Sequence, residues 1–121
     1  MIKIRKADKE EVHRIVCMVE DYFEMDRGMI HSKSRVQGVV IPRQIAQCLV
    51  RDRFKSHLSL SNIGELVGNK NHATILSSMT RVNNLIETEE HFRNIYNELK
   101  VAVRTSKENL IHKEILQVVP I

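Results

Sequence analysis

Residues that make turns, crosslinks and aromatic contacts are scarce in this 121-residue chain. It has four glycines, two prolines and no tryptophan. A fold built of many short strands needs frequent turn residues, so this scarcity favours long helices with short connections. The two cysteines, Cys17 and Cys48, fall inside helical patterns and are too few for a disulfide scaffold. They predict two reduced core thiols in a cytoplasmic protein.

Several chemical signatures are also missing. No apolar run approaches the roughly 18 residues of a membrane span, and there is no signal peptide. The six histidines lack zinc-ligand spacing, and no phosphate-binding glycine loop, nucleophile elbow or plausible pair of catalytic carboxylates occurs. The sequence therefore favours a binding protein over an enzyme, and it implies no metal, cofactor or membrane contact.

Positive charge is concentrated in one part of the chain. The formal net charge is +4, but residues 27–57 contain seven Lys and Arg against one Asp. That segment carries +6, and the rest of the chain sums to −2. A basic segment on a nearly neutral background indicates a local anionic partner. The alternative, which charge alone leaves open, is a solvated helix face.

The hydrophobic pattern predicts one all-α domain of five to six helices. Residues 1–8 are expected to form a flexible arm, 9–105 the domain, and 106–121 a C-terminal helix and tail. The first helix is predicted to begin at Lys9, with Asp8 as its N-cap. Thr88 is expected to cap a long amphipathic helix, and Ser106 to start another.

A basic loop is predicted at residues 32–41, "SKSRVQGVVI", ahead of a helix with Pro42 in its first turn. Proline suits that position, where its missing N–H has no partner to lose. Ile45, Cys48 and Leu49 of this helix are expected to face inward. Its polar residues are expected to be free to face outward: Arg43, Gln44, Gln47, Arg51 and Lys55.

Residues 59–87 follow the order short helix, turn, longer helix, which is the layout of a helix-turn-helix. Ser59 is predicted to cap the short helix, Gly68 to end it, and Asn71 to cap the longer one. Gly64 lies inside the short helix, where glycine costs about 1 kcal/mol relative to alanine. A close approach of the second helix would explain its presence there.

The segment "KNHAT" at the start of the longer helix has two interpretations. In the first, Asn71 caps the helix and its neighbours are merely exposed. In the second, Lys70 contacts a phosphate or a guanine edge, and Asn71 and His72 hydrogen-bond to bases or phosphates. Ala73 and the Thr74 methyl then pack on thymine methyls. Spacing alone leaves both interpretations open.

The stretch "PRQIAQCLVRDRF…LSLSNIGELVGNKNHATILSSMTRVNNLI" closely resembles the C-terminal DNA-binding domain of the bacterial replication initiator DnaA. The Arg-Gln pair, the "IG" of the short helix and the His-centred turn occur at compatible spacing, and the resemblance extends over about residues 10–100. It implies an all-α, Trp-repressor-like fold with a central helix-turn-helix that binds double-stranded DNA.

The resemblance also implies roles for residues at matching positions. In that family an arginine of the basic loop enters the minor groove, and the Arg-Gln pair contacts DNA. A basic residue two turns later touches the DNA backbone, and the start of the recognition helix reads bases in the major groove. The implied DNA-binding residues here are Lys33, Arg35, Arg43, Gln44, Arg51, Lys70, Asn71, His72, Ala73 and Thr74.

The chain departs from the family pattern in several respects. Asn71 and Ala73 stand where the family usually has Asp and Thr. Because an acid accepts a hydrogen bond from cytosine whereas Asn suits adenine, a different base preference is expected. The basic loop has fewer arginines, so binding should depend less steeply on salt. This sequence contains no counterpart of the initiator's upstream ATPase module, so a stand-alone module or a fragment of a longer protein is expected. Met1 and the distinct C-terminal tail favour the first of these.

The leading hypothesis is therefore sequence-specific binding of double-stranded DNA, in replication or transcription control. The alternative is a protein–protein adaptor that retains the fold without specific DNA readout, which the thin basic loop and the apolar tail would suit. The tail, around residues 118–121, is also a candidate surface for a protein partner or for self-association.

Overall fold

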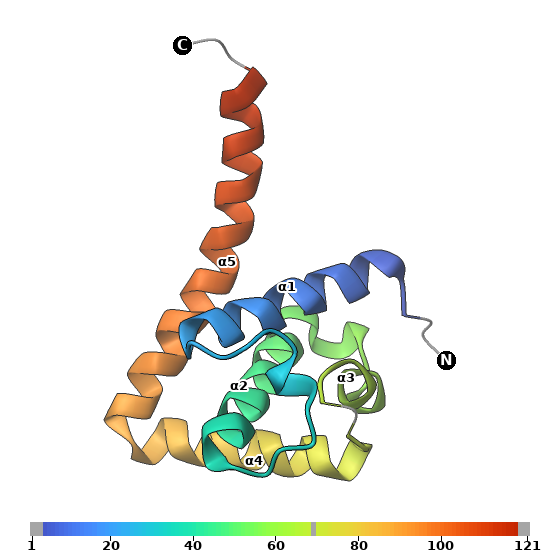
Figure 1. The fold of residues 1–121 in the computed structure, drawn as a ribbon, viewed down its shortest axis with the longest axis vertical. Coiled ribbons are helices and arrows are strands. Elements are labelled where there is room, and N and C mark those ends of the chain that lie inside the picture. Colours follow the sequence, from blue (N-terminus) through green and yellow to red (C-terminus); the bar gives the residue numbers. More distant parts are fainter. Residues whose placement is uncertain (1–3, 69, 119–121) are drawn as a thin grey trace.

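The structure is a computed structural model. It describes the backbone of residues 4–68 and 70–118, and the side chains of these residues apart from Ser56 and 106–118. In this part of the chain every regular element is a helix, which confirms the all-α prediction (Figure 1). The elements are α1 (Lys6–Tyr22), η1 (Met29–His31), α2 (Gln37–Phe54), η2 (Lys55–His57), α3 (Leu60–Leu66), α4 (His72–Thr88) and α5 (Glu90–Val118).

The helix α2 is the centre of the arrangement. It packs against α1, α3 and α4, and both short 3-10 helices contact it. The first half of α5 packs on α4 and α1, whereas its second half extends beyond the other helices (Figure 1). The position of α2 between the N-terminal segments and the helix-turn-helix allows its side chains to link the two.

A single apolar core is built from all five α-helices. Each contributes a side chain that is at most 2% exposed: Val12, Ile45, Ile63, Ile75 and Leu99. Full burial of one such side chain contributes about 1.5–3 kcal/mol to stability. The inward direction predicted for Ile45, Cys48 and Leu49 is confirmed, because all three are buried.

The two cysteines are free thiols, as predicted. Cys48 is buried in the core, and burial raises its pKa to about 12, so it stays protonated at neutral pH. Cys17 is only half-buried, so the predicted core position is wrong for this thiol, and burial still raises its pKa. Since the thiolate is the reactive form, neither thiol is activated for chemistry.

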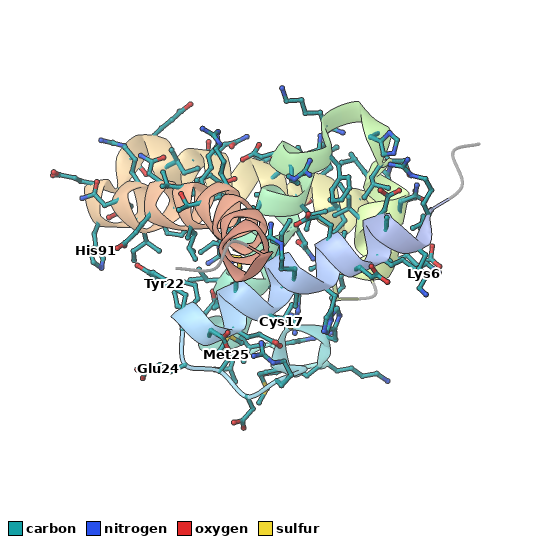
Figure 2. All side chains as sticks on the ribbon, turned by 90° about the horizontal axis from the view of Figure 1, so that it is seen from above. Lys6, Cys17, Tyr22, Glu24, Met25 and His91 are labelled. Atoms are coloured by element: carbon teal, nitrogen blue, oxygen red, sulfur yellow. The ribbon has the colours of Figure 1, made fainter. Side chains whose placement is uncertain are left out.

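Polar contacts join α5 to the other helices. Tyr22, at the end of α1, lies beside α5 (Figure 2), where its hydroxyl donates a hydrogen bond of 2.8 Å to Glu98. The buried Tyr96 hydroxyl of α5 donates to the Asp52 carboxylate of α2. Burial and this hydrogen bond raise the pKa of Tyr96, so the hydroxyl remains a donor at every physiological pH.

No helix in the described part of the chain is long and apolar enough to cross a membrane.

The helix α1 begins earlier than predicted, at Lys6, with Arg5 at the N-cap position. Asp8 is therefore the third helical residue instead of the cap. Its carboxylate accepts hydrogen bonds from the Arg5 backbone N–H (3.3 Å) and from the Arg5 guanidinium (3.1 Å). An acid at this position reaches back to the N-cap N–H, as in a capping box, which explains the misplaced boundary. Residues 1–3 of the expected arm lie outside the described residues.

Asp8 also makes the stability of the protein sensitive to acid. Hydrogen bonds from Arg5 lower the pKa of Asp8 below its ordinary value of 3.8. Its stabilising contribution is present above that ordinary value and is lost as the pH falls through the lowered pKa. We expect the unfolding free energy of the wild type to fall more between about pH 5 and pH 2 than that of Asp8→Asn, which cannot ionise. Urea titrations at both pH values measure this difference, and equal losses would contradict it.

The basic loop is shorter than predicted, because α2 begins at Gln37 rather than at Pro42. From here on, the basic loop is residues 32–36. Pro42 is the sixth residue of the helix, where its missing N–H leaves the Gly38 carbonyl without the usual donor. The first turn is held by two hydrogen bonds of 2.9 Å to the Val36 carbonyl. The buried Pro42 ring adds apolar contact, which offsets one missing hydrogen bond.

Two predicted helix starts are wrong. Thr88 is the last residue of α4, and its hydroxyl donates back to the Asn84 carbonyl (2.8 Å). The helix α5 then begins at Glu90 and runs unbroken to Val118, so Ser106 starts no new helix. Ser and Thr hydroxyls bond either to N–H groups at a helix start or to a carbonyl one turn earlier, so residue type does not distinguish the two. The tail residues 119–121 lie outside the described residues.

Candidate nucleic-acid interface

The helices α3 and α4 form the predicted helix-turn-helix. At the start of α3 the Ser59 hydroxyl accepts a hydrogen bond from the Asn62 N–H (3.0 Å). At the start of α4 the Asn71 side-chain oxygen accepts one from the Thr74 N–H (2.9 Å). Gly68 follows α3 with a φ of +86°, in the left-handed region that favours glycine. Both predicted caps and the predicted end of α3 are confirmed.

Gly64 is the point where α3 meets the turn and α4. A Cβ atom at this position would lie 2.0 Å from the Lys70 carbonyl oxygen and 3.1 Å from the Ile75 Cγ1 atom. The Lys70 N–H donates to the Gly64 carbonyl (2.8 Å), which satisfies a carbonyl near the C-terminus of α3. The close approach predicted from this glycine is confirmed.

The first turn of α4 faces solvent. Asn71, His72, Ala73 and Thr74 are exposed, whereas Ile75 directly behind them is fully buried. The Asn71 oxygen is engaged in the cap, and no other hydrogen bond reaches this side chain from the described residues. Its amino group is thus available as a donor. The turn therefore combines a fixed position with side chains that remain accessible.

The basic loop presents its two cations outward. Lys33 and Arg35 are exposed, and neighbouring Val36 is 69% exposed. The Ser32 hydroxyl accepts from the Ser34 N–H (3.4 Å), and the Ser34 hydroxyl accepts from the Val36 N–H (3.3 Å). These local bonds shape the loop and leave the charged side chains on its surface.

Arg43 was predicted to face outward, and this prediction is wrong. It is 4% exposed, and its guanidinium lies against residues 30–34, which include the first part of the basic loop. It donates three hydrogen bonds to carbonyls, at 2.7 Å to Ile30, 2.7 Å to Ser32 and 3.1 Å to Ser34. The prediction failed because helical periodicity assigns charged residues to the exposed face. Buried backbone carbonyls need hydrogen-bond donors, and one arginine side chain supplies several.

The other polar residues of α2 differ in their surroundings. Gln47 is buried, contrary to prediction, because its amino group donates to the Val67 carbonyl (3.1 Å) at the end of α3. Gln44 and Arg51 are half-buried, and Lys55 is exposed. Arg51 lies in the last turn of α2, at the opposite end of the helix from the basic loop. Its guanidinium donates a hydrogen bond to the Lys55 carbonyl (2.8 Å) just after the helix.

Sequence reasoning missed two residues that fix the segment before the basic loop. Glu20 is 1% exposed, and its carboxylate accepts hydrogen bonds from the N–H groups of Gly28 (2.8 Å) and Ile30 (3.2 Å). His31 Nδ1 accepts a hydrogen bond from the Gly68 N–H (3.3 Å), which joins this segment to the helix-turn-helix. The position of Glu20, next to an apolar stripe of α1, was a usable signal. Nothing in the local pattern marks His31.

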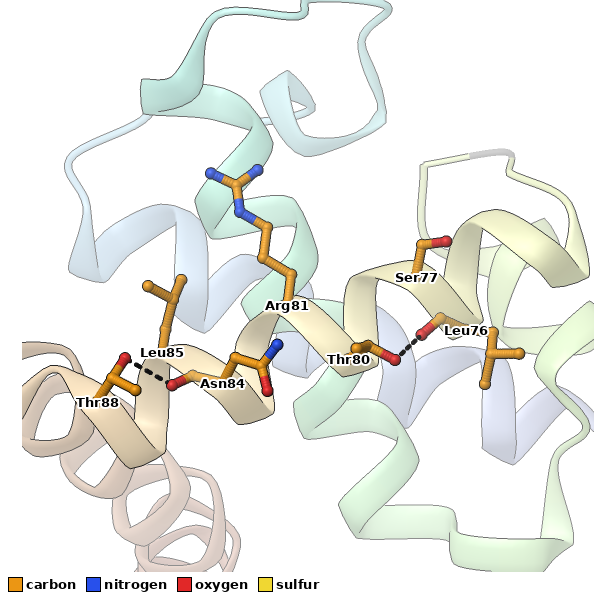
Figure 3. Close-up of a pocket in the computed structure, with 7 residues that line it drawn as sticks. All are labelled: Leu76, Ser77, Thr80, Arg81, Asn84, Leu85 and Thr88. Carbon is orange, nitrogen blue, oxygen red and sulfur yellow. Dashed lines mark hydrogen bonds between the residues drawn. The ribbon is translucent and has the colours of Figure 1, made fainter.

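A groove runs along the exposed side of α4, beyond its first turn (Figure 3). The Thr80 and Thr88 hydroxyls in it donate back to helix carbonyls, and Arg81 donates to the Gln37 side chain at the start of α2 (2.8 Å). These hydroxyl groups are therefore engaged within α4 itself. The side chain of Arg81 links α4 to α2. The lining residues are Leu76, Ser77, Thr80, Arg81, Asn84, Leu85 and Thr88.

Among the described residues no group of three His, Cys, Asp or Glu could hold a metal.

The fold and this surface define a helix-turn-helix protein with an exposed recognition-helix start and an adjacent basic loop, which is a class of DNA-binding domain. A family model described as "Bacterial dnaA protein helix-turn-helix" matches residues 12–82, more than half of the chain. The chain therefore belongs to the bacterial DnaA helix-turn-helix family.

Similar proteins include chromosomal replication initiator proteins DnaA from three bacteria. The chain is 35% identical to that of Flavobacterium psychrophilum over 82 residues, 35% to that of Geobacter sulfurreducens over 99, and 32% to that of Geobacter metallireducens over 111. These matches cover 68%, 82% and 92% of this chain, but 17%, 22% and 23% of the relatives. The chain thus spans about a fifth of the length of the curated relatives it matches.

Proposed function

We propose that this chain binds double-stranded DNA with sequence specificity, with the start of α4 in the major groove and the basic loop in the adjacent minor groove. The observation that carries the proposal is the exposed first turn of α4, held in place by the close contact at Gly64. A helix N-terminus with accessible polar side chains is what a helix-turn-helix presents to base edges. The relatives are replication initiators, which favours a role in replication control, with transcription control as a second use of the same binding.

The proposed contact residues divide by chemistry into three groups. Asn71, His72 and Thr74 have hydrogen-bonding groups for base edges, and with the small Ala73 they contribute specificity. Arginine is drawn to the deeper negative potential of a narrow minor groove, which is the role proposed for Arg35. The remaining proposed contacts position the protein on phosphates. They come from the exposed Lys33 and from the half-buried Gln44, Arg51 and Lys70.

Selection from a pool of random duplexes, followed by titration of the recovered site across salt concentrations, tests the proposal. We expect a defined site, with binding that weakens as salt rises. Lys33→Ala and Arg35→Ala should each lower the log–log salt slope by about 0.9 for every phosphate group that the variant no longer neutralises. The matched control is Lys100→Ala, an exposed lysine on α5, which should leave the slope unchanged. A pool that yields no preferred sequence would contradict specific readout.

The adaptor alternative predicts a different result. If the fold serves only to bind another protein, the basic side chains of the proposed DNA interface are dispensable for whatever weak DNA affinity remains. The double variant Arg35→Ala with Lys70→Ala separates the two functions. Equal DNA affinity of this variant and the wild type would exclude the DNA-binding proposal and favour the adaptor.

A further inference from the structure

Arg43 is a buried cation whose partners are all backbone carbonyls. Its three hydrogen bonds reach Ile30, Ser32 and Ser34, which are 13, 11 and 9 residues away in the chain. In the described part of the chain no carboxylate lies within ion-pair distance of its guanidinium. Burial lowers the pKa of Arg43, but arginine keeps its proton at any physiological pH. The side chain is therefore a charged anchor for one stretch of backbone.

The same side chain touches the turn of the helix-turn-helix. A Cβ atom added to Gly68 would lie 2.9 Å from the Arg43 Cδ atom, so the aliphatic part of Arg43 passes directly against this glycine. The Gly68 N–H donates to His31, in the segment that Arg43 holds on its other side. Arg43 thus lies between the basic loop and the turn that leads into α4.

The basic loop has few other anchors. The other hydrogen bonds to Ser32 and Ser34 from described residues stay within residues 29–36. At the α2 end of the loop, the Val36 carbonyl accepts from the first turn of α2. The hydrogen bonds from Arg43 are the ones that tie Ser32 and Ser34 to α2. Without them the backbone from Ser32 to Arg35 would keep only hydrogen bonds within its own segment, and Arg35 would be less firmly placed relative to α4.

From these contacts we infer that Arg43 is a positioning residue, which holds the basic loop against the helix-turn-helix so that Arg35 can enter the minor groove. The inference rests on the proposed function and changes the role that the family resemblance implies for Arg43. A side chain that is 4% exposed and bound to three carbonyls acts on DNA through the loop, not through a contact of its own. It couples minor-groove and major-groove recognition, because loop and turn are fixed to one side chain.

The first test needs no DNA, because the basic loop contains two trypsin sites, after Lys33 and after Arg35. Arg43→Met keeps the aliphatic contact with Gly68 and removes the donors. Arg43→Lys keeps the charge, but a single ammonium group does not span three carbonyls. We expect cleavage at both loop sites to become about tenfold faster in each variant, since local opening governs the rate. Cleavage after Lys100, in the first half of α5, should not change.

Arg53→Met is the matched control, an arginine in the last turn of the same helix whose replacement should leave loop cleavage unchanged. Loop cleavage of both Arg43 variants at the wild-type rate would overturn the inference. A parallel rise in cleavage after Lys100 would also overturn it, because Arg43 would then support the whole fold and not the loop.

The second test is a double-mutant cycle on the selected DNA site. We expect Arg43→Met and Arg35→Ala each to weaken binding about tenfold. In the Arg35→Ala background, Arg43→Met should add less than about twofold, because both changes remove the same contact. Arg43→Lys should bind as weakly as Arg43→Met. Effects that multiply, or full rescue by lysine, would show a direct phosphate contact and overturn the inference.

The two tests fail independently. If the wild type binds no duplex, the proposed function is wrong, while the cleavage result still decides whether Arg43 anchors the loop. If the wild type binds a specific site but the loop is cleaved equally in all variants, the proposed function stands and the positioning role does not.

Discussion

Replacement of Gly64 by alanine is expected to lower the free energy of unfolding by about 2 kcal/mol or more and to abolish specific DNA binding. The added Cβ would lie 2.0 Å from the Lys70 carbonyl oxygen, and this neighbour is backbone that no rotamer change can move. Alanine gains up to about 1 kcal/mol of helix propensity over glycine, which the steric conflict must exceed. Relief requires the turn to move away from α3, and this displaces the first turn of α4.

The matched control is Gly38→Ala, in the first turn of α2. A Cβ atom at Gly38 would have no neighbour within 4 Å. We expect this variant to be unchanged or more stable by up to about 1 kcal/mol, through helix propensity and reduced unfolded-state entropy. Urea denaturation of the three proteins measures the difference. A Gly64→Ala variant as stable as the Gly38→Ala variant would contradict the close contact between α3 and the turn.

Exchange of Asn71 for aspartate is expected to change the base preference at one position of the DNA site by about tenfold, with little effect on stability. The Asn71 oxygen caps α4 through the Thr74 N–H, and aspartate caps as well as asparagine does. The amino group is the part that differs. Asparagine suits adenine, whereas an aspartate has no donor and accepts a hydrogen bond from cytosine. The preference should therefore move from adenine toward cytosine.

Two further variants separate capping from readout. Asn71→Ala removes both functions, so it should lose about 1 kcal/mol of stability together with the base preference. Ser59→Ala removes the corresponding cap of α3, and it should lose a similar amount of stability without any change in preference. Thermal denaturation and selection from randomised duplexes supply the two measurements. An unaltered preference in Asn71→Asp would exclude this side chain from base recognition.

Asn71 can cap α4 and read DNA at the same time. From the sequence, capping and DNA reading are competing interpretations of one residue. In the structure the cap uses one lone pair of the side-chain oxygen, so the second lone pair and the exposed amino group remain for a base. The two functions are compatible because the amide oxygen can accept a second hydrogen bond, from the adenine amino group, while the amide amino group donates to the adenine ring.

The helix-turn-helix was predictable because its signals are local. The caps at Ser59 and Asn71 each bond to an N–H three residues later, and Gly68 lies just beyond the end of α3. Interactions of this range depend on residue type and spacing, which the sequence displays. The core stripes were predictable for the same reason, since helical periodicity places apolar residues on one face.

The candidate interface was predictable only in part. The exposure expected for Asn71, His72 and Arg35 is present, and the roles proposed for them await the DNA experiments. The exposure expected for Arg43 is wrong, although its residue type and position match the family pattern. An exposed arginine can bind an external anion, whereas a buried arginine donates hydrogen bonds to backbone carbonyls. The residue type alone does not tell which of the two roles an arginine has.

The sequence by itself determined the helical class, the apolar stripes, the caps of α3 and α4, and the family. The tertiary structure decided where α2 begins, which arginine is buried, and how the basic loop is held. The contacts responsible join distant residues: His31 and Gly68 are 37 residues apart, and Gln37 and Arg81 are 44 apart. Such pairs leave no periodic trace in the sequence, because each partner is chosen by the packing of whole helices. That packing places Arg43 beneath the basic loop. It thereby fixes the position of the basic loop relative to the start of α4, the two segments proposed to bind DNA.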